Sequence, residues 1–236
     1  MRIHSDDPSR YLLEPSNLDR DALPDFLRAY REPLKNVLSW SREFLSNPHP
    51  DLGREGAVCP YTLPSLERNL FWMTVYPGAH PTMDEVRSVV MAYCDWFLEL
   101  VPLTGRDAQY KTILILFPDL APELAPGIID IIQATLKPEF VPKGLMIGQF
   151  HAVCEEPGLR NPHFRPLRTT VPLLAIRHMV ATDFPFLAKK PEWVASYLEV
   201  FGGNLPKRVR REVEEIAHAY GLAIPEPEPQ PQPAIK

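Results

Sequence analysis

Two short and almost wholly apolar segments constrain the fold more than any other feature of the chain. Residues 69–76 and 110–117 are rich in aromatic and β-branched side chains, and a proline follows each segment. Between them, Thr82-Met83-Asp84-Glu85 forms a capping box, and apolar residues then recur at helical spacing as far as Val101. A buried strand, a helix and a second buried strand predict a parallel pair joined by a right-handed crossover.

Further strands and helices complete the predicted sheet. Residues 145–153 and 172–180 predict two more strands, and we expect them to be antiparallel because no helix separates them. Proline and glycine mark the ends of the other predicted helices. Two helices begin at Asp21 and Pro33, and another runs from Pro126 to Lys137-Pro138. Two more span residues 190–201 and 206–220, and Gly221 ends the second of these. The sequence therefore predicts an α+β fold: a four-stranded mixed sheet in the order β-α-β-α-β-β, flanked by helices, with helical additions at both ends.

The ends of the chain differ in character from its middle. Residues 1–20 show no periodicity, so we expect them to be poorly ordered or draped over the surface. Residues 222–236 alternate proline with glutamate or glutamine and offer little to bury, which predicts a disordered, polyproline-like tail. A single α+β domain is expected between them, over residues 21–221.

Charge and cysteine usage narrow the class of protein. With a net charge of −5, the chain has no global attraction for nucleic acid or for an anionic membrane surface. No apolar stretch approaches the roughly 18 residues of a membrane span. Three cysteines without a Cys-x-x-Cys motif favour a reducing compartment, so we expect a cytoplasmic protein. The sequence has no phosphate-binding loop, dinucleotide fingerprint or nucleophile elbow, so no motif supports a kinase, a Rossmann dehydrogenase or an α/β-hydrolase.

Two long connections are the strongest indication of a functional site. Residues 47–67 (the Cys59 loop) and residues 154–171 (the arginine loop) both exceed the roughly 15 residues beyond which unstructured loops are uncommon unless functional. Cys59 precedes Pro60, which stiffens the backbone around a thiol that can serve as a nucleophile or a haem ligand. The alternative is that Cys59 is a small buried apolar residue.

The arginine loop carries a local excess of positive charge. No aspartate or glutamate occurs from Pro157 to Thr182, a stretch that contains Arg160, His163, Arg165, Arg168, Arg177 and His178. Arginine can bind a carboxylate or phosphate through two parallel hydrogen bonds, so the loop predicts a site for a small anionic molecule. The alternative is that these arginines pair with acidic residues of the protein, such as Glu155, Glu156 or Asp119.

Two histidines are candidates for chemistry near neutral pH. His151 lies near the end of the third predicted strand and His163 lies in the arginine loop; each can act as a general acid or base or as an axial haem ligand. A histidine at the end of a strand can also be purely structural. His151 and Cys154 would count toward a zinc site, but four ligands are wanted and no second pair occurs at a suitable spacing, so we expect no metal site.

Motifs in the central part of the chain resemble a bacterial family known only as a domain of unknown function. The likeness covers roughly residues 50–205 and implies no activity. It is carried by Gly56-Ala-Val-Cys-Pro-Tyr61, Lys111-Thr-Ile-Leu-Ile-Leu-Phe-Pro-Asp119, Lys137-Pro-Glu-Phe140, Gly144-Leu-Met-Ile-Gly-Gln-Phe-His151 and Asn161-Pro-His-Phe-Arg-Pro-Leu-Arg168.

In layout, the chain also resembles the YqcI/YcgG family of haem-dependent enzymes, some of which oxidise amine nitrogen. That family has an early Pro-Cys element, reversed here as Cys59-Pro60, and a later Pro-x-His followed by arginines, which corresponds here to Pro162-His163-Phe164-Arg165. The resemblance implies that Cys59 or a histidine ligates haem and that Arg165 and Arg168 hold its propionates.

Two functional hypotheses follow. In the first, the protein is a small-molecule biosynthetic enzyme, performing haem-dependent oxidation between the Cys59 loop and the arginine loop, with Cys59 and His163 as catalytic residues. The cofactor would be bound by His151, Arg160, Arg165 and Arg168. In the alternative, the same arginines make a non-catalytic binding site for an anionic ligand or a protein partner.

Overall fold

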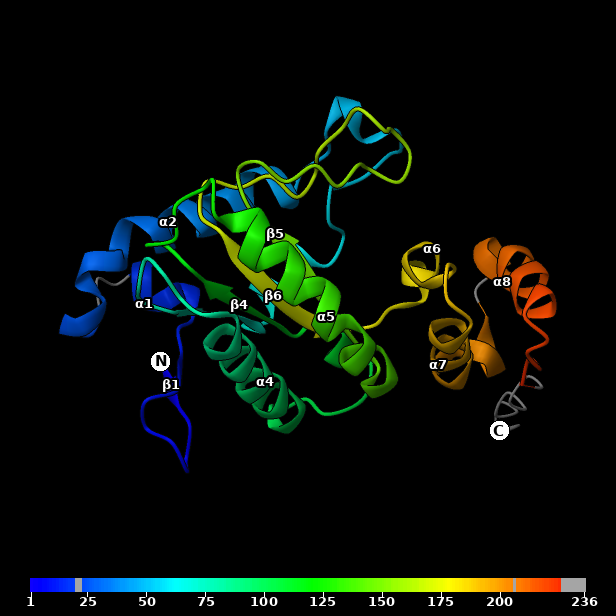
Figure 1. Cartoon of the computed structure of the whole chain (residues 1–236), viewed down its shortest axis with the longest axis horizontal. Coiled ribbons are helices and arrows are strands. Elements are labelled where there is room, and N and C mark those ends of the chain that lie inside the picture. The colour runs from blue at the N-terminus through cyan, green and yellow to red at the C-terminus, as the bar shows by residue number, and fades with distance from the viewer. Residues whose placement is uncertain (20–22, 206, 226–236) are drawn as a thin grey trace, which may run out of the picture. The chain divides into compact units, whose positions relative to one another are not determined.

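The sheet has the composition that the sequence predicts. The computed structural model describes residues 1–19, 23–205 and 207–225, and its main sheet is four-stranded and mixed (Figure 1). In spatial order the strands are β3 (Phe71–Val75), β4 (Thr112–Leu116), β6 (Leu173–His178) and β5 (Leu145–Phe150). The α+β prediction is therefore confirmed.

Strand directions bring three strand ends together. β3 and β4 are parallel and β4 and β6 are antiparallel. The backbone N–H of Met179, directly after β6, donates to the carbonyl of Gly144, directly before β5, at 2.8 Å. The end of β6 therefore lies beside the start of β5, so this pair is antiparallel as predicted. Hence β3, β4 and β5 run in one direction and finish at the same side, which we call the carboxyl end of the sheet.

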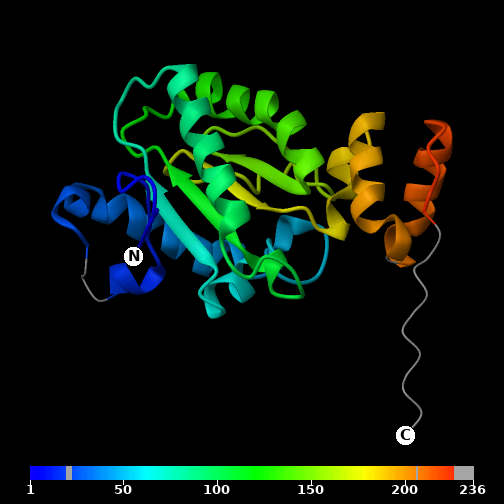
Figure 2. The ribbon, with the colours of Figure 1, turned by 90° about the horizontal axis from the view of Figure 1, so that it is seen from below.

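Helices cover both faces of the sheet. Figures 1 and 2 show α4 (Met83–Glu99) and α5 (Ile131–Phe140) on one face and α2 (Arg31–Trp40) on the other. The capping box that opens α4 is present: the Thr82 hydroxyl accepts from the N–H of Glu85 at 3.2 Å, and the Glu85 carboxylate accepts from the N–H of Thr82 at 2.8 Å.

The apolar strands bury side chains on both faces, as their composition requires. Phe71, Met73 and Val75 belong to the core cluster that contains the inner face of α2. Neighbouring strand residues point the other way: the Thr74 hydroxyl lies 2.8 Å from the hydroxyl of Tyr93 on α4. Both faces are therefore closed, which explains why these strands lack a polar alternation.

The N-terminal segment, which we expected to be poorly ordered or draped over the surface, contributes residues to the core. Residues Leu12 and Leu13 are fully buried, and Leu13 exchanges backbone hydrogen bonds with Met73 of β3 at 2.8 and 2.9 Å. The segment forms β1 (Arg2–Ile3), β2 (Tyr11–Leu12) and α1 (Pro15–Asp19). Strands of two residues are too short for a periodic pattern, so this burial comes from tertiary contacts alone.

Two further boundaries need correction. α5 does not end at Lys137-Pro138 but continues to Phe140, whose side chain is fully buried. The Cys59 loop is shorter than predicted, because α3 (Thr62–Glu67) occupies its end and a turn of 3-10 helix, Pro50–Leu52, its beginning. Other short helical segments are Asp25–Tyr30, Ser41–Leu45, Ala108–Tyr110, Pro126–Asp130, Val141–Lys143, Ala181–Asp183 and Gly202–Asn204.

The chain divides into two compact units. The first, residues 1–137 and 146–178, contains the sheet. The second, residues 138–145 with the described residues from Met179 onward, contains α6 (Phe184–Leu187), α7 (Pro191–Phe201) and α8 (Lys207–Ala219).

The last helix ends where the sequence predicts. Gly221 adopts a left-handed conformation (φ +68°), and the N–H groups of Gly221 and Leu222 donate to His218 and Ala217, which closes α8 with a Schellman motif. The predicted tail falls mainly on residues 226–236, which lie outside the described residues. Within the described ranges, no helix has the length and apolar character needed to cross a membrane.

Candidate functional site

The Cys59 loop and the arginine loop lie against each other, as Figure 1 shows. The Asn161 side-chain amide donates to the carbonyl of Asp51 at 2.9 Å, and the His49 ring stacks on Phe164 with 4.7 Å between centroids. A Cβ at Gly53 would approach Cβ of Arg160 to 2.8 Å, so only glycine permits this approach. Rings and backbone therefore fill the contact between the loops.

The arginines bind the protein itself. Arg165 donates from Nε to the Glu155 carboxylate at 3.2 Å and from Nη1 to the carbonyl of Pro162 at 2.6 Å. Arg168 donates from Nη2 to the same carboxylate and from Nε to the carbonyl of Cys154 at 3.0 Å. These hydrogen bonds hold the pKa of Glu155 below its usual value, the bond from Arg165 having the largest effect. The pairing with Glu155, one of the two sequence alternatives, is the arrangement observed.

The remaining loop candidates lie at the surface. Arg160 and His163 are exposed, and Cys59 is half-buried with its backbone N–H bonded to the carbonyl of Leu45 at 2.8 Å. The loops meet at His49, Asp51 and Gly53 rather than at Cys59. Of the predicted site residues, Arg160 lies at this contact, against Gly53.

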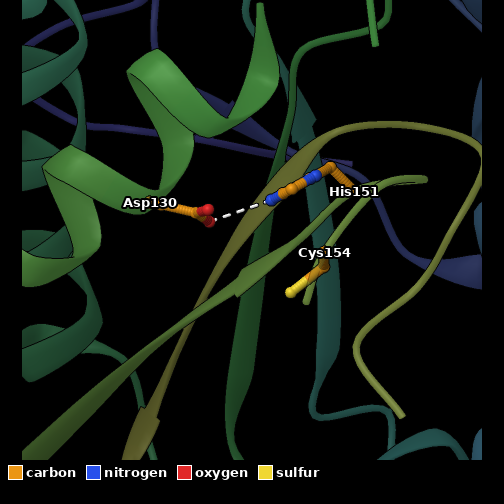
Figure 3. A group of neighbouring side chains, drawn as sticks. All are labelled: Asp130, His151 and Cys154. Carbon is orange, nitrogen blue, oxygen red and sulfur yellow. Dashed lines mark hydrogen bonds and ion pairs between the residues drawn. The ribbon is translucent and has the colours of Figure 1, made fainter. Parts of the chain in front are cut away.

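The structure brings together a different group: Asp130, His151 and Cys154 (the His151 cluster; Figure 3). Nε2 of His151 lies 2.9 Å from Oδ1 of Asp130. One potential ligand atom from each of the three residues lies within 4.8 Å of the other two. Sequence reasoning named His151 and considered Cys154, but it missed Asp130.

Local structure explains how each side chain reaches this position. Asp130 is the last residue of Pro126–Asp130, a π-helical turn that follows β4 and leads into α5; such turns occur frequently at functional sites. His151 directly follows β5, and the N–H of Cys154 donates back to its carbonyl at 3.2 Å, which forms a turn. Because Arg168 binds the carbonyl of Cys154, the arginine loop fixes that turn. The cluster therefore lies at the carboxyl end of the sheet.

Burial makes the cluster chemically unusual. The His151 side chain is 0% exposed, whereas that of Asp130 is 39% exposed and gives the cluster its contact with solvent. Nδ1 of His151 is buried and has no hydrogen-bond partner among the described residues. Burial raises the pKa of the Cys154 thiol, and the nearby charges of Asp130 and Glu156 raise it further.

These contacts do not fit the haem site that the resemblance implies. Propionates would have to compete with Glu155 and backbone carbonyls for the donors of Arg165 and Arg168. An axial imidazole needs a nitrogen facing the iron, but Nε2 of His151 is bonded to Asp130 and the ring is enclosed. We therefore assign no step to haem.

The fold and the cluster define a class: an α+β protein with polar, ligand-capable side chains at the carboxyl end of a mixed sheet. Residues 34–212 match the family described as Domain of unknown function (DUF6875), which includes all three cluster residues, and the chain belongs to this family. No curated protein and no solved structure matches the chain.

Proposed function

We propose that this protein is an enzyme that acts on a small molecule and that the His151 cluster is its active centre. The observation that carries the proposal is the state of His151: a fully enclosed imidazole, 2.9 Å from a carboxylate, whose second nitrogen has no partner among the described residues. A buried polar atom without a partner costs about 1–3 kcal/mol, and such costs are tolerated mainly where function requires them.

The position of the cluster supports the same proposal. In open sheets with parallel strands, ligands bind outside the carboxyl ends of the strands. His151 follows β5, and Asp130 comes from the connection that leaves β4, so both belong to that side. The partly exposed carboxylate of Asp130 gives a small molecule a direct approach to otherwise buried groups.

Each residue has a role that its surroundings favour. Asp130 orients the imidazole and stabilises its protonated form, as carboxylates do for catalytic histidines. His151 supplies a nitrogen lone pair that can accept a proton or bind an electrophile near neutral pH. Cys154 adds a thiol, and Arg168 acts as a positioning residue by holding the turn that presents it.

The experiment compares two histidine variants of the full-length protein. Purified protein is incubated with a complex metabolite extract, and mass spectrometry identifies the compounds consumed. We expect His151→Gln to slow the conversion by at least about 100-fold, the usual contribution of a positioned acid or base. His163→Gln, the matched control on the surface of the arginine loop, should be unaffected.

If His163→Gln slows the conversion and His151→Gln does not, the reaction takes place between the two loops. If nothing is consumed and both variants bind the same metabolites as the wild type, the non-catalytic alternative would be favoured. Titration with hemin tests the haem-dependent version separately: a Soret band that is lost in Cys59→Ser would restore it.

A further inference from the structure

We infer that the His151 cluster is a zinc site, with Asp130, His151 and Cys154 as its three protein ligands. The inference rests on the proposed function in keeping the His151 cluster as the active centre; with zinc bound, Asp130 and His151 act as metal ligands rather than as a proton-transfer pair. It departs from the sequence-based expectation of no metal, which counted His151 and Cys154 and found no further ligand.

The spacing of the donor atoms fits one ion. Two donors bound to zinc at about 2.0–2.1 Å and a tetrahedral angle lie roughly 3.3 Å apart. Oδ1 of Asp130 and Nε2 of His151 are already 2.9 Å apart, and the Cys154 ligand atom lies within 4.8 Å of its two counterparts. In Figure 3 the Asp130 carboxylate and the Nε2 end of the His151 ring point toward each other.

The donor set selects the metal. A thiolate is a poor ligand for Mg²⁺ and Ca²⁺, which take oxygen donors, whereas zinc accepts sulfur, imidazole nitrogen and carboxylate oxygen together. A thiolate and a carboxylate also bring two negative charges beside a neutral imidazole, which matches a divalent cation. In the cluster, the side chain of Cys154 is buried, so a thiolate there has little solvent to stabilise its charge.

The number of ligands indicates the kind of zinc site. Structural zinc has four protein ligands, whereas catalytic zinc commonly has three and keeps a fourth position for water or substrate. Here three residues contribute, and the exposed side of Asp130 leaves the fourth position toward solvent. Zinc in this position would lower the pKa of a bound water to near 7, so hydrolysis of a small molecule is the reaction class we assign.

The protein also holds the ligands in place. His151 and Cys154 belong to one turn, in which the N–H of Cys154 donates to the His151 carbonyl, and the N–H of His151 donates to the carbonyl of Leu167 at 3.3 Å. Arg168 fixes the far end of the turn through the carbonyl of Cys154. Side chains of metal sites are normally supported in this way by surrounding hydrogen bonds.

Cobalt(II) is the probe for the test, because it replaces zinc and its spectrum reports the ligands. Full-length protein is stripped with a chelator, titrated with CoCl₂ and then with ZnCl₂. We expect one cobalt ion per chain, the visible bands of four-coordinate cobalt, and a near-ultraviolet charge-transfer band from a thiolate ligand. Zinc should displace the cobalt stoichiometrically.

Variants then identify the ligands. Cys154→Ser should remove the charge-transfer band, and Asp130→Asn should weaken cobalt binding at least tenfold. Cys59→Ser is the matched control and should bind cobalt as the wild type does. Because Asp130 is partly exposed, its variant gives a result even if the buried Cys154 variant does not fold. No cobalt spectrum in the wild type, or a charge-transfer band that persists in folded Cys154→Ser, would overturn the inference.

Metal binding and catalysis can fail separately. One equivalent of zinc bound by a protein that turns over no substrate supports the zinc site and contradicts the proposed function. Turnover that survives complete removal of metal but is lost in His151→Gln supports the proposed function and overturns the zinc inference.

Discussion

Lys111 and His151 are two buried ionisable side chains at opposite ends of the sheet, and they differ in their hydrogen-bond partners. Lys111, directly before β4, is 1% exposed; its ammonium donates to the carbonyls of Leu100 at 2.7 Å and Phe97 at 3.1 Å and lies 4.7 Å from the centre of the Phe97 ring. It thereby satisfies carbonyl groups at the C-terminal end of α4, which cannot bond within the helix. His151, directly after β5, has a carboxylate partner and one nitrogen with no partner among the described residues.

Burial of an ionisable side chain therefore does not by itself mark a functional site. Lys111 has protein acceptors around its ammonium, so its burial stabilises the joint between a helix and a strand. His151 retains bonding capacity that the described part of the protein does not use, next to a thiol and a carboxylate. Unused bonding capacity is therefore the better indicator of function.

The largest effect should come from Lys111→Ala. This change removes a buried side chain and leaves the carbonyls of Phe97 and Leu100 without a donor, so we expect the free energy of unfolding to fall by about 2–4 kcal/mol. Urea denaturation measures it. Lys111→Met, which keeps the unbranched stem, should recover at least half of the loss. Equal losses in the two variants would show that packing contributes little.

The titration of Lys111 should make the free energy of unfolding depend on pH. Burial lowers the pKa of Lys111 from its ordinary value of 10.5 to about 8. Between these values the unfolded state binds more protons, so the wild type should gain stability relative to Lys111→Met as pH rises, by at most about 1.4 kcal/mol per pH unit. Below pH 8 the difference should be constant. A difference that is flat from pH 8 to 10 would mean that the folded protein keeps an ordinary lysine.

His151→Leu should have little effect on stability. Leucine is close to histidine in volume and removes a buried polar atom that has no partner, while Asp130 can be hydrated from its exposed side. We expect the free energy of unfolding to change by less than about 1 kcal/mol, or to rise, because functional groups are often kept at a cost to stability. A loss of stability as large as that of Lys111→Ala would show that His151 is a structural residue like Lys111 and would contradict the distinction between them.

The smallest change should come from Glu155→Gln, because the arginine loop resembles Lys111 in having its cations bound by the protein. Loss of the carboxylate leaves Arg165 and Arg168 without their shared partner, while the sheet is untouched. The melting temperature should stay constant, but limited proteolysis within residues 154–171 should become faster. Glu156→Gln, next to it in sequence, is the control and should be cleaved at the wild-type rate. If Glu155→Gln is cleaved at the wild-type rate, the loop is held by its aromatic contacts alone.

Elements with a local physical signature could be predicted from the sequence. The apolar strands, the Thr82–Glu85 capping box and the Gly221 helix end were predicted correctly because each depends on residues close together in the chain. The four-stranded mixed sheet followed from their order. The N-terminal strands and the end of α5 were missed because contacts distant in sequence stabilise them.

The candidate site was predictable only in part. His151 and Cys154 drew attention as individual residues, but nothing in the sequence connects them with Asp130, which lies on another element. Which segments become strands and helices follows from the sequence alone, because backbone propensity and hydrophobic periodicity are local. The partners of the charged groups depend on the packing of distant segments: Glu155 pairs with two arginines, Lys111 with the end of α4, and Asp130 with His151. Such partnerships depend on how helices pack on the sheet, and that packing brings together residues that no sequence spacing relates.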